Sequence, residues 1–263
     1  REVGAIFPEL ALPPPGEVVL ELDGVWTRDE CVRDVSLTVR RGEIVGMAGL
    51  VGSGKSEAMQ AAFGAMAVDR GQVRYKGKDV LAQSPGKAIR SGFIYLPADR
   101  HVDGLMMMRS ARENMSLAAL DVPPFRTGIF LDRGGERRRV AELADGLNLS
   151  PNKPERAVDH FSGGNQQKAM LARALSRDLD LVVFDEPTVG VDVGTRAAIY
   201  RFIVELAEAG TAVVIVSSDL PEILNLSSRA YVFYRGTIQA ELAQAELTEE
   251  AVLANFFEKD AAE

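Results

Sequence analysis

This sequence of 263 residues has a single cysteine, no long apolar run and no excess of basic residues. Cys31 is the single cysteine, which excludes a disulfide framework and a cluster of thiol metal ligands and favours a reducing compartment. No apolar run approaches the roughly 20 residues that cross a bilayer. The first residues also lack the basic start and apolar core of a signal peptide. We therefore expect any action at a membrane to need a partner.

The charge balance is acidic, with a net charge of −8. A dedicated nucleic-acid-binding protein usually presents a basic field, so we expect no nucleic-acid partner. The hydrophobic fraction of 46% and the charged fraction of 26% are ordinary for a globular protein and argue against a disordered chain. The length allows one α/β domain or two small ones.

The apolar pattern changes several times along the chain. Residues 12–16 (LPPPG) predict a stiff linker, because consecutive prolines fix φ and remove backbone donors. From Val18 the alternation of apolar and polar residues predicts strands, whereas residues 100–160 have helical periodicity and predict an inserted helical subdomain. Beyond them, apolar strands alternate with helices, which predicts a mostly parallel sheet covered on both faces.

Residues 49–56 form the sharpest motif, because they match G-x-x-x-x-G-K-S/T at every specified position. An apolar strand is expected before them and a helix after them. This context argues against the alternative that a glycine-rich turn matches the motif by chance. Glycines let backbone N–H groups wrap phosphates, Lys55 supplies a positive charge and the Ser56 hydroxyl can ligate Mg²⁺. The candidate ATP-binding residues in this segment are Gly49, Gly52, Ser53, Gly54, Lys55, Ser56 and Glu57.

Two carboxylates end an apolar run at residues 181–186. A buried strand that delivers Asp185 beside Ser56 is the usual way for a phosphate-binding-loop protein to hold Mg²⁺. Glu186 would then point to the other side of the strand end, where it can orient or deprotonate a water molecule. Acidic residues before Pro187 can equally well begin the next turn or helix. The two interpretations stay open for this motif alone.

A serine and two glycines, Ser162, Gly163 and Gly164, open a predicted helix downstream. Such a helix start can be an anion cradle, or simply a capped helix. In combination with the motifs above, the segment FSGGNQQ resembles the signature sequence of ATP-binding cassette (ABC) ATPases. The resemblance implies a P-loop NTPase fold with an antiparallel β subdomain and an inserted helical subdomain. It also implies that this loop binds the ATP held by a second ABC cassette.

The resemblance extends over nearly the whole chain. Asp192 falls at the place of the family's D-loop aspartate, and Trp26 at the place of the ring that stacks on adenine, although Trp26 can also be an ordinary apolar staple. The segments PADRHVDGL, ARENMSL and DEPTVGVDVGTRAAIY resemble the second cassette of bacterial ribose-, galactose- and xylose-type importers. The resemblance implies residues 1–17 as a linker after a preceding domain, residues 18–243 as the nucleotide-binding domain and residues 244–263 as a terminal helix and tail.

Several functional expectations follow from this resemblance. The chain would bind Mg²⁺ and ATP and energise a membrane sugar importer from the inner, cytoplasmic face of a bacterial cell membrane. Its partners would be the second cassette, a transmembrane permease and, indirectly, a sugar-binding protein. A permease helix would dock in a groove lined by parts of Leu96–Met108 and by the ARENMSL helix, unless the run Leu105–Met108 is core packing instead.

The sequence departs from the family at two places. Ser218 stands where most members have a histidine that contacts the γ-phosphate, and Ala98 and Asp99 stand where a glutamine is usual. A serine cannot become cationic, so it would stabilise developing charge less well. The main alternative is therefore a nucleotide-gated dimerisation half with little hydrolysis at its own site. ABC ATPases of DNA repair or translation fit less well, because no long coiled coil lies between Lys55 and Ser162 and the chain is acidic.

Overall fold

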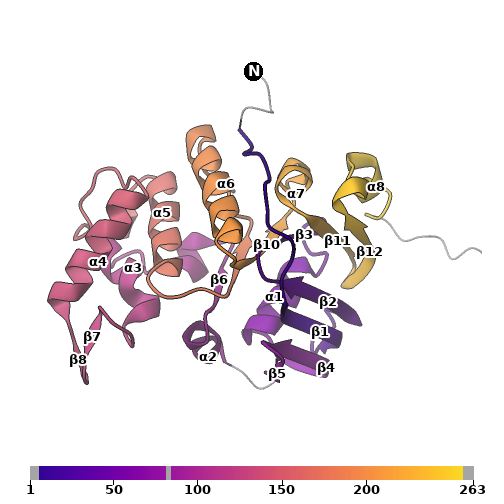
Figure 1. The fold of residues 1–263 in the computed structure, drawn as a ribbon, viewed down its shortest axis with the longest axis horizontal. Helices are drawn as coiled ribbons and strands as arrows, with labels where there is room; N and C mark the ends of the chain where they lie inside the picture. The colour runs from indigo at the N-terminus through magenta and orange to yellow at the C-terminus, as the bar shows by residue number, and fades with distance from the viewer. Residues whose placement is uncertain (1–5, 81–83, 257–263) are drawn as a thin grey trace, which may run out of the picture. The chain divides into compact units, whose positions relative to one another are not determined.

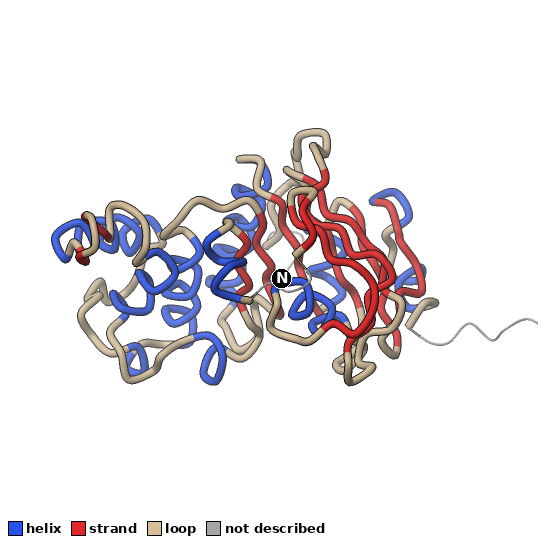
Figure 2. The backbone as a smooth tube through the Cα atoms, turned by 90° about the horizontal axis from the view of Figure 1, so that it is seen from below, coloured by secondary structure: helices blue, strands red, loops and turns tan. Residues whose placement is uncertain are grey.

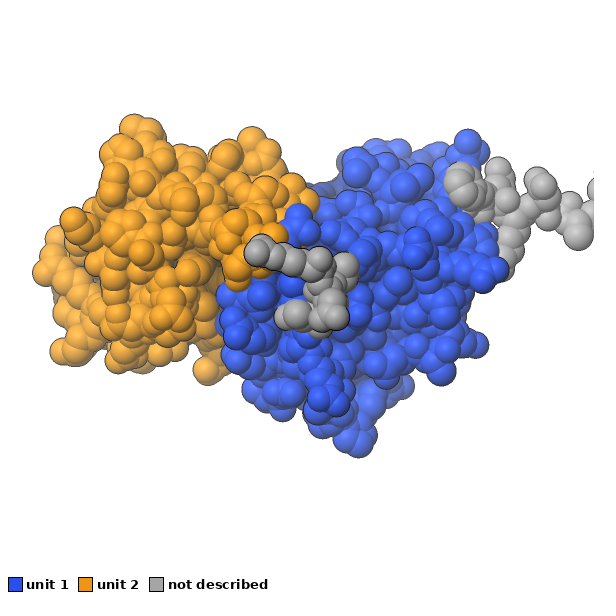
Figure 3. Space-filling view, turned by 90° about the horizontal axis from the view of Figure 1, so that it is seen from above, with its two compact units in different colours: residues 1–95, 180–187, 196–263 blue, residues 96–179, 188–195 orange. Residues whose placement is uncertain are grey.

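The computed structural model describes residues 6–80 and 84–256, and the chain divides into two compact units. Unit 1 comprises residues 1–95, 180–187 and 196–263, and unit 2 comprises residues 96–179 and 188–195 (Figure 3). The predicted helical subdomain, about residues 100–160, falls inside unit 2. The ends of the predicted linker and tail, residues 1–5 and 257–263, lie outside the described residues. No described helix is both long and apolar enough to span a bilayer.

Unit 1 contains an antiparallel sheet of four strands in the order β2-β1-β4-β5 (Figures 1 and 2). The burial of β2 alternates strictly between core and surface, which is the pattern that the sequence predicts for a strand with one solvated face. The strand bounds are Val18–Thr27 for β1, Val35–Arg40 for β2, Val68–Tyr75 for β4 and Lys78–Asp79 for β5.

A second sheet of six strands has the order β12-β11-β3-β10-β9-β6. Strand β3 runs parallel to β11 and to β10, β10 runs parallel to β9, and β12 is antiparallel to β11. Every residue of β3, β9 and β10 is buried, because a parallel strand in the middle of a sheet has no solvated face. The bounds are Ile44–Ala48 (β3), Phe93–Leu96 (β6), Leu181–Asp185 (β9), Ala212–Ser217 (β10), Arg229–Tyr234 (β11) and Thr237–Ala243 (β12).

The register of this sheet brings three strand ends together. Ser217 pairs with Ala48, and Val216 pairs with Asp185. Strands β3, β9 and β10 therefore end at the same edge of the sheet. The residues that follow each strand leave the sheet at this edge, where open α/β sheets bind their ligands.

Helix α1 joins the two sheets into one core. Its buried residues Ala58, Met59, Ala62 and Phe63 belong to a single apolar cluster that also includes residues of β1 and β10. Helix α7 packs against β3 and β10. The helices with most or all of their residues in unit 1 are α1 (Lys55–Phe63), α2 (Pro85–Arg90), α6 (Val193–Glu208), α7 (Leu220–Leu226) and α8 (Glu249–Leu253).

Unit 2 is mainly helical, with one two-stranded pair (Figure 2). Helices α3 and α4 start at side-chain caps: the Ser110 hydroxyl accepts from Glu113 N in a capping box at the start of α3, and Asp132 accepts from two amides at the start of α4. Arg173 on α5 is half-buried, and desolvation lowers the pKa of its guanidinium to about 10. The elements are α3 (Ala111–Ser116), β7 (Arg126–Thr127), β8 (Phe130–Leu131), α4 (Arg133–Gly146) and α5 (Gly163–Ala174).

Short helical turns complete the description of both units. Among residues 6–80 and 84–256, three of them lie in unit 2, at Arg100–Gly104, Leu117–Ala119 and Val158–His160, and one lies in unit 1, at Gln244–Glu246. The turn at Arg100–Gly104 begins at a side-chain cap, because Asp99 accepts from His101 N and Val102 N. These turns connect the main elements without extending the sheets.

A buried ion pair in unit 1 gives a prediction about stability. The Arg229 guanidinium lies 2.8 Å from Glu43, which is 2% exposed, and also 2.8 Å from Glu241, which is 54% exposed. Glu43→Ala should lower the free energy of unfolding by about 3 kcal/mol, because it leaves a half-buried cation without its inner partner. Glu241→Ala should cost under about 1 kcal/mol. Urea unfolding followed by fluorescence of Trp26, the single tryptophan, measures both variants. Equal losses would contradict the prediction.

Candidate nucleotide-binding site

A glycine-rich loop joins β3 to α1. Gly52 and Gly54 have φ of +78° and +95°, in the left-handed region that favours glycine. A Cβ on Gly54 would lie 2.6 Å from the Cys31 carbonyl oxygen, and a Cβ on Gly49 would lie 2.4 Å from Ser53 Oγ. The loop thus has no room for a side chain at Gly49 or Gly54. It forms a cradle of backbone N–H groups at the start of α1, which suits a phosphate.

Lys55, the first residue of α1, is 3% exposed. Its Nζ lies 3.2 Å from Glu186 Oε1. Glu186 has a φ of +47°, which is strained for a residue with a Cβ. Ser218 holds the same carboxylate with two hydrogen bonds, from its N–H at 2.9 Å and from its hydroxyl at 3.1 Å. The three predicted catalytic residues, Lys55, Glu186 and Ser218, therefore form one connected cluster.

Asp185 ends β9 with its carboxylate buried beside the phosphate loop. One of its oxygens accepts a hydrogen bond of 2.9 Å from the Ser56 hydroxyl, and the other accepts from the Tyr95 hydroxyl. Burial raises the pKa of Asp185, and these two hydrogen bonds act against that rise. A hydroxyl and a carboxylate in contact are oxygen donors of the kind that Mg²⁺ prefers. The donor set at Ser56 and Asp185 therefore fits magnesium.

The other predicted residues of unit 1 lie around this cluster. Trp26 is on β1, and the Arg70 guanidinium lies 5.2 Å from the centroid of its ring. The Ser53 hydroxyl is buried and has no hydrogen-bond partner among the described residues. A bound ligand could supply that partner. Glu57 is a half-buried acidic residue in the first turn of α1.

The predicted signature residues lie in unit 2. Ser162 is the N-cap of α5, and Gly163 and Gly164 are its first residues. A Cβ on Gly164 would lie 2.6 Å from Thr195 Oγ1. Asp192 accepts hydrogen bonds from Thr195 N at 3.0 Å and from Thr195 Oγ1 at 2.7 Å, and these bonds lower its pKa. The structure thus brings Asp192 and the signature glycines together through Thr195.

Sequence reasoning missed Tyr95 and Arg100. Tyr95 accepts a hydrogen bond of 3.3 Å from Gln60 and stacks on Phe63, so its hydroxyl is held toward Asp185. Both residues lie in the segment where the usual glutamine is absent, and that absence was the available signal for their importance.

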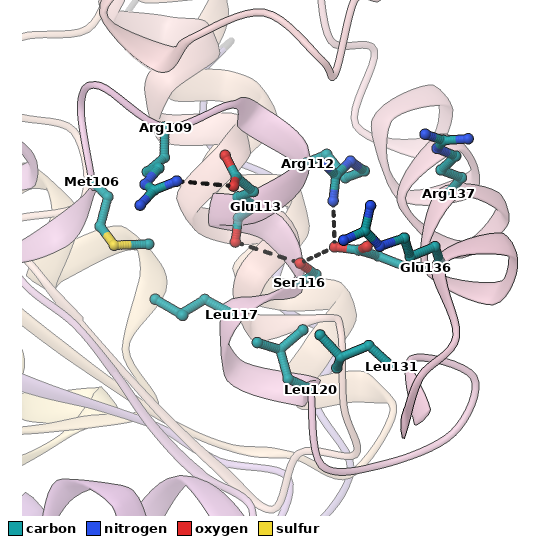
Figure 4. Close-up of a pocket in the computed structure, with 11 residues that line it drawn as sticks. Met106, Arg109, Arg112, Glu113, Ser116, Leu117, Leu120, Leu131, Glu136 and Arg137 are labelled. Carbon is teal, nitrogen blue, oxygen red and sulfur yellow. Dashed lines mark hydrogen bonds and ion pairs between the residues drawn. The ribbon is translucent and has the colours of Figure 1, made fainter. Parts of the chain in front are cut away.

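Unit 2 also contains a pocket of about 490 Å³ between α3, α4 and the β7–β8 pair (Figure 4). Leu117, Leu120 and Leu131 form its apolar side in this view. On the other side Arg112 lies 2.8 Å from Glu136, which also accepts 2.7 Å from the Ser116 hydroxyl. The pocket therefore combines an apolar wall with a charged rim whose members are mostly paired.

Residues 32–189 match the family described as ABC transporter. The chain belongs to this family. It is 42% identical over 240 residues to a ribose import ATP-binding protein of Rubrobacter xylanophilus, covering 91% of this chain and 46% of that protein. It is 42% identical over 219 residues to an arabinose import ATP-binding protein of Pectobacterium atrosepticum, covering 83% of this chain and 43% of that protein. The ABC chain thus spans about half the length of these curated relatives.

Solved structures of ABC cassettes share the fold. A nucleotide-free ATP-binding cassette from an ABC transporter has a TM-score of 0.74 and 22% identity, covering 90% of this chain and 96% of that chain. A dimeric cassette in a post-hydrolysis state with ADP and phosphate has a TM-score of 0.75 and 22% identity, covering 86% of this chain and 98% of that chain. These matches, with the family match, confirm the predicted P-loop ABC ATPase fold.

The Tyr95–Asp185 contact gives a testable prediction. Tyr95→Phe should lower the free energy of unfolding by about 1–3 kcal/mol, because a buried carboxylate oxygen loses its partner. It should also raise the pKa of Asp185 further, since the hydrogen bond from Tyr95 lowers that pKa. Gln60→Ala is the matched control, because it removes only the 3.3 Å bond to the Tyr95 hydroxyl. Urea unfolding without magnesium compares the two, and a larger loss for the control would contradict the assignment.

Proposed function

We propose that this chain is the ATP-binding and ATP-hydrolysing cassette of a bacterial sugar importer. The observation that carries the proposal is the cluster at the phosphate loop, in which Lys55 contacts Glu186 and Ser56 contacts Asp185. The names of the curated relatives support the transport role, since they are import ATP-binding proteins for ribose and for arabinose. Resemblance to second cassettes supports the C-terminal half of a two-cassette polypeptide.

The nucleotide would bind along the loop between β3 and α1. The backbone N–H groups of the loop and the Lys55 ammonium would hold its phosphates, and the Trp26 ring would stack on adenine. Ser56 and Asp185 would hold magnesium, which when bound neutralises phosphate charge. The other proposed ATP-binding residues of this segment are Gly49, Gly52, Ser53, Gly54 and Glu57.

Glu186 is the proposed general base. Its carboxylate would orient and deprotonate the attacking water once phosphate replaces it as the partner of Lys55. Ser218 would act through Glu186, because both its N–H and its hydroxyl donate to that carboxylate. These two hydrogen bonds also favour the alternative function, a dimerisation half with little hydrolysis. Ser218 donates to Glu186 and carries no positive charge, so it would not stabilise the charge that develops on the phosphate.

A second ABC cassette would complete the active unit. Ser162, Gly163 and Gly164 would present the start of α5 to the ATP held by that cassette, and Asp192 would lie at the same interface. The dimeric form of a structural neighbour supports two cassettes acting together. In this arrangement the chain contributes to catalysis even where its own site turns over slowly.

The permease would contact unit 2, and through it a sugar-binding protein would act indirectly. The pocket beside α3 supports this proposal, because Leu117 and Leu131 are 42% and 56% exposed apolar residues at a protein surface. Of the run Leu105–Met108, Leu105 is buried while Met106 and Met108 are exposed, so the docking proposal for this run concerns the two exposed methionines. The permease would hold the chain at the inner, cytoplasmic face of the cell membrane.

The first experiment measures Mg·ATP binding to this chain through Trp26 fluorescence. We expect quenching that saturates with Mg·ATP. Lys55→Ala should weaken binding by at least about tenfold, because a charge-assisted hydrogen bond to phosphate is worth about 1.5–3 kcal/mol. Glu241→Ala, on the far end of a surface ion pair, serves as the control. Binding that does not respond to Lys55→Ala would rule out the phosphate loop as the site.

Turnover in the assembled two-cassette protein separates the two functions. Glu186→Gln should abolish hydrolysis at this site if Glu186 is the base, while ATP binding persists. Unchanged turnover would reject Glu186 as the base and favour the dimerisation half.

Docking of the permease is tested at Leu117. Leu117→Glu should lower sugar transport by an order of magnitude, as for an interface residue worth about 2 kcal/mol, while Trp26 still reports ATP binding. Leu253→Glu is the matched control, since both leucines are 42% exposed and Leu253 lies outside the pocket. Loss of folding in Leu117→Glu would instead favour core packing, and equal transport in the two variants would contradict docking here.

A further inference from the structure

Arg100 lies shortly after β6, next to Ala98 and Asp99, which stand where most family members have a glutamine. It is the first residue of the helical turn Arg100–Gly104. Asp99 caps this turn by accepting from His101 N at 2.8 Å and from Val102 N at 3.1 Å. These bonds lower the pKa of Asp99, so the cap stays ionised well below neutral pH. The half-buried Arg100 side chain therefore starts from a defined backbone position.

The Arg100 guanidinium reaches two separate loops. Its Nε donates to Gln166 Oε1 at 3.2 Å, on the signature helix α5. Its Nη1 donates to the Val189 carbonyl at 3.0 Å and its Nη2 to the Gly190 carbonyl at 3.4 Å, in the segment that leads to Asp192. A planar guanidinium can make these bonds together, which a single ammonium cannot do.

Gln166 extends the effect to the signature loop. It is 6% exposed, and its Nε2 donates to the carbonyls of Phe161 at 3.2 Å and Val158 at 3.3 Å. His101 Nε2 lies 3.1 Å from the same Oε1 that Arg100 contacts. The residue directly before Ser162 is thus tied to Arg100 through one buried amide.

The two loops have glycines where the guanidinium lies. A Cβ on Gly163 would come within 3.0 Å of Arg100 Nη2, and a Cβ on Gly190 within 3.2 Å of the same atom. Gly190 also has a φ of +71°. Close approach of Arg100 to both backbones therefore depends on the missing side chains.

We propose that Arg100 is a positioning residue that locks residues 161–164 and 188–192 into one fixed arrangement. The backbone N–H groups of the signature loop are thereby preset for the ATP held by the second cassette, and binding does not have to order them. This inference rests on the proposed function for its catalytic consequence. The lock itself is a property of unit 2 alone.

Arg139 is a second arginine of unit 2 with backbone and side-chain partners, but it does not join the two loops that Arg100 contacts. It donates to the Leu175 carbonyl at 3.2 Å and to Glu142 at 3.1 Å. Neither of these partners lies in residues 161–164 or 188–192. Arg139→Ala is therefore a matched control that removes an arginine with similar bonds.

The test uses Arg100→Ala, Arg100→Lys and Arg139→Ala. In this chain without nucleotide, Arg100→Ala should speed amide hydrogen exchange in residues 161–166 and 188–192, and Arg139→Ala should leave both segments unchanged. In the assembled transporter, Arg100→Ala should lower kcat for ATP by about tenfold to a hundredfold, as for a misplaced catalytic loop. Quenching of Trp26 by Mg·ATP in this chain should stay at its original affinity.

Arg100→Lys separates positioning from charge and gives a second variant if the alanine variant does not fold. We expect it to behave as Arg100→Ala does, because lysine keeps the charge without the planar fork. Full kcat in Arg100→Lys, or unchanged exchange in both loops, would overturn the inference. If Mg·ATP does not bind the unmutated chain while exchange still rises in Arg100→Ala, the lock stands and the proposed function fails.

Discussion

The parallel pairing of β3, β9 and β10 is the constraint on which the candidate site depends. Because Ala48 pairs with Ser217 and Val216 with Asp185, the three strands end together. The phosphate loop, the two carboxylates and Ser218 each begin where one of these strands stops. Slipping one strand by one residue would turn every side chain of that strand to the opposite face. The buried apolar side chains of the sheet therefore fix the geometry of the polar site.

Glycine has a different purpose in each unit. In the phosphate loop, Gly49 and Gly54 leave space for the backbone to pass close to Ser53 and Cys31. In unit 2, Gly163 and Gly190 leave space for a guanidinium, and Gly164 leaves space for Thr195. A glycine in such a motif can therefore be needed because a neighbouring segment packs against it, and not only because a ligand binds there. A motif of this kind is best interpreted together with the residues that pack against it.

The sequence predicted the fold class, but it did not predict the contacts between the residues of the candidate site. The apolar runs and the alternation of strands and helices required a parallel sheet, and the phosphate-loop motif required a strand before it and a helix after it. The bonds of Tyr95 to Asp185 and of Ser218 to Glu186 could not be predicted. They depend on which strand lies next to which, and a local pattern does not contain that information. The domain boundaries and residue roles inferred from the family stay predictions.

The pairing of Lys55 with Glu186 has a consequence for the empty protein. A lysine that is 3% exposed would be costly to keep charged without a counter-ion. Glu186 supplies that counter-ion from within the fold. In the proposed function, a bound phosphate would replace Glu186 beside Lys55, so the buried ammonium would keep an anionic partner with and without nucleotide. The carboxylate would then be free to act on a water molecule only while phosphate occupies the loop.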